Sequence, residues 1–193
     1  MSPTTVSTLV KRIHATPTQL VLAVTGGGSG ALAELLQVPG ASRTVRAAVV
    51  PYAEAALEQF VGGKLERLCS ADTARTMATA CLRQACFLTG GDDRLSCDPA
   101  APLAGVACTA ALATDRPRKG EHRVHLATQT ATTTRSSSLV LAKGRRTRAE
   151  EEQLVTRLVI NHVAAVCGLE DELPLDLLDG EELRTAHDDT AFK

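Results

Sequence analysis

The residues best suited to chemistry form the run Thr25-Gly26-Gly27-Gly28-Ser29-Gly30. The apolar segment 20–24 precedes it and has the character of a buried strand, and leucines at helical spacing follow it to about Gln37. A strand that passes through a glycine turn into a helix start directs backbone N–H groups and the positive end of the helix dipole at one point. The pattern predicts a small anionic ligand, such as a nucleotide, bound by Gly26, Gly27, Gly28, Ser29 and Gly30.

This glycine turn matches neither of two common phosphate-binding motifs in full. It lacks the Gly-Lys-Ser/Thr ending of a P-loop. The spacing of Gly26, Gly28 and Ala31 fits the loose dinucleotide fingerprint, but no acidic residue ends the second predicted strand, which reads Val49-Val50-Pro51-Tyr52. A structural alternative therefore stays open, in which the glycines only permit a tight turn from strand to helix.

Basic residues follow a third predicted strand, 103–109. Ligands of parallel sheets bind beyond the carboxyl ends of the strands, so Arg116 and Lys119 are candidate ligand-binding residues. The alternative is a solvated turn. The basic run 143–148 is interpreted as a helix entry that pairs with Glu150–Glu152, because no aromatic side chains accompany it as they would at a nucleic-acid site.

The composition fits a single globular domain. The chain has 193 residues, of which 44% are hydrophobic and 22% charged, and no apolar run has the length of a membrane helix. The N-terminal residues lack the apolar core of a secretion signal, so we expect a cytoplasmic protein without a membrane partner. Aromatic residues make up only 2% of the chain, which argues against a surface that stacks nucleic-acid bases.

The cysteines and histidines do not form a metal-binding pattern. None of the six cysteines belongs to a CxxC pair, so we expect free thiols. His122 and His125 lie three residues apart on a predicted strand and should face opposite sides of the sheet. We therefore expect neither a metal nor another cofactor.

Charge divides the chain into two parts. Residues 170–193 carry nine of the 22 acidic residues and only two basic ones, which leaves the preceding part basic. A basic body suits an anionic ligand, whereas an acidic terminus is usually a solvated extension. We expect residues 1–168 to form the domain and 169–193 to be an acidic tail that adds little to the core.

The order of the predicted elements indicates an α/β fold. Helices alternate with buried strands as far as residue 109. A predicted hairpin of strands 121–130 and 136–143 follows, and a long helix over 148–167 comes last. We expect a three-layer α/β/α sandwich with a mixed, mostly parallel sheet.

Three spaced motifs resemble a known family. They are Val38-Pro39-Gly40-Ala41-Ser42, Val49-Val50-Pro51-Tyr52 and Gly105-Val106-Ala107-Cys108-Thr109. Together they resemble the C-terminal domain of the CinA family, which includes the nicotinamide-nucleotide amidases, over about residues 5–168. The resemblance implies that domain's fold, a homo-oligomer, and hydrolysis of the carboxamide of nicotinamide mononucleotide.

The resemblance also implies site residues, with departures from the family pattern. The family's nucleophilic serine falls on Thr25, its preceding glutamate on Val24, and its lysine on Leu57. Thr25 or Ser29 would attack the amide, with Tyr52 as a candidate catalytic residue in the lysine's absence. Thr109, at the end of the matched strand, joins the expected ligand-binding residues.

Two further segments are similar to a divergent branch of CinA-like proteins, Arg118-Lys119-Gly120-Glu121-His122-Arg123 and Arg145-Arg146-Thr147-Arg148-Ala149-Glu150-Glu151. Two functional hypotheses follow. The chain is either a divergent amidohydrolase acting on a pyridine nucleotide, or a nucleotide- or phosphate-binding module of the same fold that has lost hydrolysis. A third possibility is a structural relative without a ligand.

Overall fold

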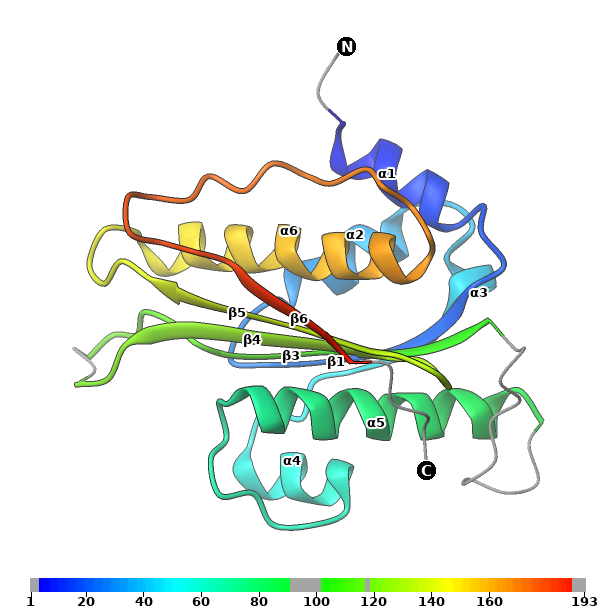
Figure 1. The fold of residues 1–193 in the computed structure, drawn as a ribbon, viewed down its shortest axis with the longest axis horizontal. Helices are drawn as coiled ribbons and strands as arrows, with labels where there is room; N and C mark the ends of the chain where they lie inside the picture. The colour runs from blue at the N-terminus through cyan, green and yellow to red at the C-terminus, as the bar shows by residue number, and fades with distance from the viewer. Residues whose placement is uncertain (1–3, 91–101, 117–118, 189–193) are drawn as a thin grey trace.

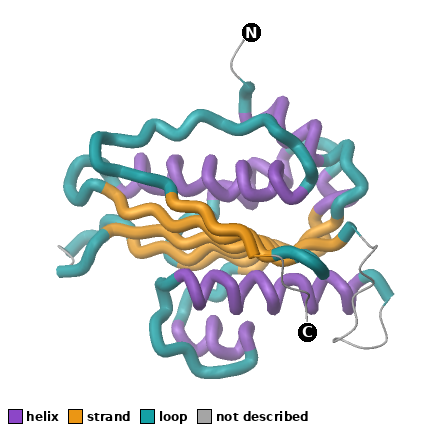
Figure 2. Tube along the Cα trace, viewed as in Figure 1, coloured by secondary structure: helices purple, strands orange, loops and turns teal. Residues whose placement is uncertain are grey.

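The computed structural model describes residues 4–90, 102–116 and 119–188. One sheet lies between two layers of helices, so the three-layer α/β/α prediction is confirmed (Figure 1; Figure 2 shows the layers by secondary structure). Helix α5 covers one face, with α4 packed against it on the outside, and α1, α2 and α6 lie on the other face. The helices are α1 (Val6–Ile13), α2 (Gly30–Gln37), α3 (Ala41–Thr44), α4 (Glu54–Val61), α5 (Ala71–Leu88) and α6 (Arg148–Val166).

The six strands lie in the order β2-β1-β3-β4-β5-β6. β1 is parallel to β2 and β3, whereas β3–β4, β4–β5 and β5–β6 are antiparallel. The sheet is mixed as expected, but the prediction that it is mostly parallel is wrong, because β3, β4 and β5 follow one another without a crossover helix. The strands are β1 (Gln19–Thr25), β2 (Val45–Val49), β3 (Leu103–Ala111), β4 (His122–Gln129), β5 (Thr134–Leu141) and β6 (Arg184–Asp188).

Strand β1 is buried on both faces, which explains its unbroken apolar sequence. Leu20, Leu22 and Val24 belong to the core on the α6 side, and Val21 and Ala23 to the core on the α5 side. β1 ends at Thr25, and the glycine turn follows it directly. The helical layers on both faces of β1 therefore fix the position at which the turn begins.

Gly105 of β3 lets α5 lie close against the sheet. A Cβ atom at this position would lie 2.0 Å from the carbonyl oxygen of Ala78 and 2.4 Å from the backbone nitrogen of Leu82. The glycine in the matched family motif is thus required here by helix–sheet packing.

The C-terminal segment is part of the folded domain. Residues 169–188, here called the C-terminal strap, cross over α6 and end in β6, which pairs with β5 (Figure 1). Leu173 is 3% exposed within the core, and Leu175 and Leu177 pack against it. The expectation that this segment adds little to the core is therefore wrong. Leucines at alternate positions of an extended chain lie on one face, which here faces the core. From the sequence alone, the many acidic residues of the segment predict a solvated tail instead.

The thiol expectation is confirmed in part. Cys81, Cys108 and Cys167 are free thiols, and Cys69 is not disulfide-bonded. The expectation of free thiols is wrong for Cys86, which is disulfide-bonded.

His162 joins α6 to the sheet through two buried hydrogen bonds. Its Nδ1 lies 3.2 Å from Thr128 Oγ1 and its Nε2 lies 2.8 Å from Ser137 Oγ. Burial, assisted by the positive charges of Arg135 and His187, lowers the pKa of His162 to about 3. The folded protein therefore holds this imidazole neutral.

This lowered pKa predicts an acid-sensitive fold. Between the unfolded-state pKa of about 6.5 and the folded pKa, the unfolded chain binds the extra proton, so stability is lost as the pH falls through that window. We expect a slope of about 1.4 kcal/mol per pH unit from this group in urea denaturation between pH 6 and pH 4. His162→Gln should flatten the slope, and an unchanged slope in that variant would contradict the assignment.

Candidate functional site

The candidate site lies at the edge of the sheet where β1 and β3 end. Thr25 and Thr109 are paired in register at these two ends, and the glycine turn follows Thr25 directly. Because β4 is antiparallel to β3, its first residues lie at the same edge. This carboxyl edge therefore gathers the glycine turn, the end of β3, the start of β4 and the first turn of α6.

The glycine turn packs tightly against its own protein. Gly26 and Gly28 have φ angles of 73° and 87°, which L side chains rarely adopt. A Cβ atom on Gly26 would lie 1.9 Å from the Ala110 carbonyl oxygen, and one on Gly30 would lie 2.5 Å from Thr156 Oγ1. Backbone conformation and packing thus explain the glycines whether or not a ligand binds. This agrees with the alternative in which the glycines only permit a tight turn from strand to helix.

A carboxylate of the chain itself occupies the start of α2. Glu152 Oε1 accepts hydrogen bonds from Ser29 Oγ at 3.0 Å and from the Gly30 backbone N–H at 3.3 Å. Its other oxygen, Oε2, is buried without a hydrogen-bond partner and lies 3.6 Å from Arg148 Nη2. The position where the sequence predicts an external anion is therefore held by Glu152.

Arg148 links the segments that follow β1 and β3. Its Nη2 donates to the Gly26 carbonyl oxygen at 3.1 Å, and its Nη1 donates to the Ala113 carbonyl oxygen at 3.4 Å. The guanidinium thus lies between the glycine turn, the segment after β3 and the carboxylate of Glu152.

A buried histidine–carboxylate pair lies beside this arginine. His122 Nδ1 is 2.6 Å from Glu151 Oε1, and the two side chains are 7% and 0% exposed. Glu151 Oε2 also accepts the Ala113 backbone N–H at 2.6 Å, which connects the pair to the glycine turn through Arg148. A carboxylate that holds one imidazole nitrogen fixes the orientation of the ring, as in many general-base sites.

Sequence reasoning missed this pair. The alternation of β4 does place His122 and His125 on opposite faces, as predicted: His122 contacts α6, and His125 Nδ1 lies 2.8 Å from Ser138 Oγ of β5 on the other face. The available signal was the position of Glu151 in the first turn of a helix that had to cover the same face of the sheet as His122.

The hydroxyls predicted for catalysis, Thr25 and Ser29, and the one predicted for ligand binding, Thr109, fall in two separate places. Thr25 is 8% exposed, and its hydroxyl donates to the Pro51 carbonyl oxygen at 3.0 Å. Thr109 is 1% exposed and donates to the Leu68 carbonyl oxygen at 2.7 Å. Both lie toward the α4–α5 layer, whereas Ser29 is exposed and bonds to Glu152 of α6.

The remaining predicted residues are exposed. Tyr52 is 70% exposed. In contrast, Leu57, which stands at the position of the family's lysine and is not a predicted site residue, is only 2% exposed. Arg116 and Lys119 are also exposed, and no hydrogen bond or ion pair among the described residues joins them to the glycine turn. Positions 117–118, which include part of the predicted basic loop, lie outside the described residues.

Over residues 4–90, 102–116 and 119–188, no helix is long and apolar enough for a membrane crossing. The same residues contain no group of three or more His, Cys, Asp and Glu side chains arranged to hold a metal ion.

Comparison with known proteins identifies the fold. No protein-family model matches the chain, and no curated protein matches its sequence. Among solved structures, the chain is similar to the competence/damage-inducible protein CihA from Agrobacterium tumefaciens, with 22% identity, a TM-score of 0.62, and coverage of 86% of this chain and 99% of that one.

Two further structures agree. A CinA superfamily protein from Klebsiella pneumoniae matches with 16% identity and a TM-score of 0.60, over 84% of this chain and 96% of that one. A CinA superfamily protein from Escherichia coli matches with 16% identity and a TM-score of 0.58, over 84% and 88%. The chain is therefore a CinA-like α/β domain in fold, as the spaced sequence motifs predict.

The packing of the glycine turn yields a stability prediction. Gly26→Ala places a methyl group against the Ala110 carbonyl and forces a positive φ on alanine, so we expect a loss of about 2–5 kcal/mol in the free energy of unfolding. Gly120→Ala, where a Cβ atom would meet nothing within 4 Å, should stay within about 1 kcal/mol of the parent chain. Equal effects of the two changes in urea denaturation would show that the turn is not packed in this way.

Proposed function

We propose that the chain is a CinA-like domain that binds a small anionic ligand, of the nucleotide class, at the carboxyl edge of the sheet, without hydrolysis by Thr25. The observation that carries this proposal is the carboxylate of Glu152 at the start of α2, held by Ser29 and Gly30 and close to Arg148. Donors that hold one anion of the chain suit a ligand phosphate equally well.

The Glu152 contact is incomplete, which favours exchange with a ligand. Oε2 is buried without a hydrogen bond, and an unsatisfied buried oxygen of a charged group is costly. Arg148 reaches it only at 3.6 Å, because its guanidinium also donates to two backbone carbonyls. A phosphate, with more acceptor oxygens in a tetrahedral arrangement, is able to receive Ser29, Gly30 and Arg148 together.

The surroundings of Thr25 argue against its use as a nucleophile. A hydroxyl attacks when a neighbouring base accepts its proton. The Thr25 hydroxyl already donates to the Pro51 carbonyl, which is not a base, and Leu57 at the family's lysine position is an apolar core residue. The binding module is therefore the better supported of the two sequence hypotheses.

Binding at the carboxyl edge is testable by isothermal titration calorimetry with nicotinamide mononucleotide. We expect Glu152→Gln to tighten binding about three- to tenfold, because it removes the competing charge, and Arg148→Ala to weaken it about tenfold. Glu121→Gln removes the same charge from an exposed position just before β4 and should leave the affinity unchanged. Equal effects of Glu152→Gln and Glu121→Gln would reduce the proposal to general electrostatics.

Hydrolysis is tested separately, by assaying ammonia release from nicotinamide mononucleotide. We expect no release from either the parent chain or Thr25→Ala. Release that Thr25→Ala abolishes would overturn the proposal in favour of the amidohydrolase.

The His122–Glu151 pair favours one second candidate, a hydrolase that uses His122 as its base. Ammonia release that persists in Thr25→Ala and disappears in His122→Gln would support it.

A further inference from the structure

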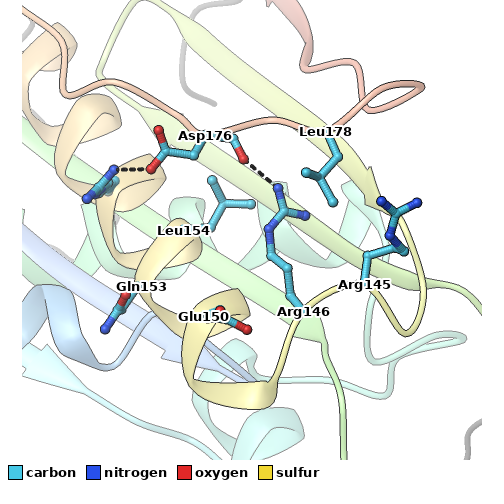
Figure 3. Close-up of a pocket in the computed structure, with 8 residues that line it drawn as sticks. Arg145, Arg146, Glu150, Gln153, Leu154, Asp176 and Leu178 are labelled. Atoms are coloured by element: carbon cyan, nitrogen blue, oxygen red, sulfur yellow. Dashed lines mark hydrogen bonds and ion pairs between the residues drawn. The ribbon is translucent and has the colours of Figure 1, made fainter.

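A second basic pocket lies between α6 and the C-terminal strap. It has a volume of about 370 Å³, within the range of about 300–1,000 Å³ that small-molecule sites occupy. Figure 3 shows Arg145 and Arg146 of the loop before α6, Leu154 of α6, and Asp176 and Leu178 of the strap around this pocket. The residues that matter here are Arg145, Arg146, Gln153, Leu154, Arg157 and Asp176.

Arg146 lines the pocket, but its guanidinium is already paired within the protein. Its guanidinium pairs with Glu181, whose side chain is 1% exposed. Glu181 also accepts the backbone N–H groups of Ala142 at 2.7 Å and Leu178 at 2.8 Å. Burial opposes ionisation of Glu181, but these hydrogen bonds outweigh it and lower its pKa. This contact therefore holds the strap in place at neutral pH.

The other two arginines are available to a ligand. Arg145 is exposed, and its side chain makes no ion pair or hydrogen bond within the described part of the chain. Arg157 Nη1 donates to the Pro174 carbonyl oxygen at 3.1 Å and to Asp176 Oδ2 at 2.9 Å. The Asp176 side chain is 84% exposed, so water screens that ion pair and it is easily replaced.

The second acidic residue of the pocket does not compete for these arginines. Glu150 Oε2 accepts the backbone N–H of Thr147 at 2.7 Å and the Thr147 hydroxyl at 2.8 Å, which completes a capping box at the start of α6. Its carboxylate is committed to the helix start, and only Asp176 has to move.

We propose that this pocket binds a small sugar phosphate or similar phosphate monoester, with Arg145 and Arg157 on the phosphate and Gln153 beside it. The phosphate takes the place of Asp176 on Arg157. Leu154 and Leu178 provide the apolar surface that covers the carbon skeleton. The site is distinct from the carboxyl-edge site, because it involves neither the glycine turn nor Glu152.

Isothermal titration calorimetry on the full chain with ribose 5-phosphate tests this site. We expect saturable binding, tighter than that of inorganic phosphate, and a gain of about threefold or more in Asp176→Asn. Arg145→Ala should weaken binding about tenfold. This is the decisive variant, because the Arg145 side chain has no hydrogen-bond or ion-pair partner to lose among residues 4–90, 102–116 and 119–188. Arg157→Ala should have a similar effect.

Two control variants separate this site from the carboxyl edge. Lys11→Ala removes an exposed positive charge of α1, outside both sites, and should leave ribose 5-phosphate affinity unchanged. A gain in Glu152→Gln that matches the gain in Asp176→Asn would overturn the proposal, because the phosphate would then bind at the carboxyl edge. Absence of binding in both the parent chain and Asp176→Asn would overturn the proposal, as would undiminished binding in Arg145→Ala. Nicotinamide mononucleotide carries the same ribose 5-phosphate group, so its titration is repeated in Arg145→Ala. A change of affinity in that variant belongs to this pocket, whereas a change in Glu152→Gln or Arg148→Ala belongs to the carboxyl edge.

Discussion

The first two turns of α6 hold the carboxyl edge of the sheet together. Arg148 contacts the glycine turn and the end of β3, Glu151 contacts His122 at the start of β4, and Glu152 contacts the start of α2. Just before the helix, Arg146 holds the strap through Glu181. The capping box of Thr147 and Glu150 sets the residue at which α6 begins. Every one of these contacts depends on that start, because a shift by one residue turns each side chain by about 100° around the helix axis.

Charge compensation within the chain is the second organising feature. Buried charges are costly unless they are paired, so the acids of α6 and the strap lie against arginines, a histidine and backbone N–H groups. The same donors suit phosphate, so at both proposed sites ligand binding would exchange one anion for another. The two proposed sites differ in how readily this exchange occurs: Glu152 is partly buried with one unsatisfied oxygen, whereas Asp176 is almost fully exposed.

Much of the fold could be predicted because its signals are local. The apolar run of β1, the helix over 71–88 and the spaced motifs shared with CinA proteins lead to a fold that solved structures share at only 16–22% identity. The strap was misjudged because nine acids in 24 residues dominated the leucines between them, and burial of those leucines depends on α6 beneath. The mostly parallel sheet was wrong because strand direction depends on pairing, which the burial pattern of each strand does not report.

The sequence by itself determined the burial of the central strands and of the helices that cover them, and where the backbone needs glycine, because apolar periodicity and the tight turn after β1 depend on neighbouring residues; the burial of the strap was the exception. Only the tertiary structure decided which anion the glycine turn faces. Glu152 lies 123 residues after Ser29, and Glu151 lies 29 residues after His122. Pairing over such separations depends on how α6 docks on the sheet, and no local pattern encodes that docking. The feature that predicts a ligand phosphate is, in the folded chain, already in contact with a carboxylate of its own.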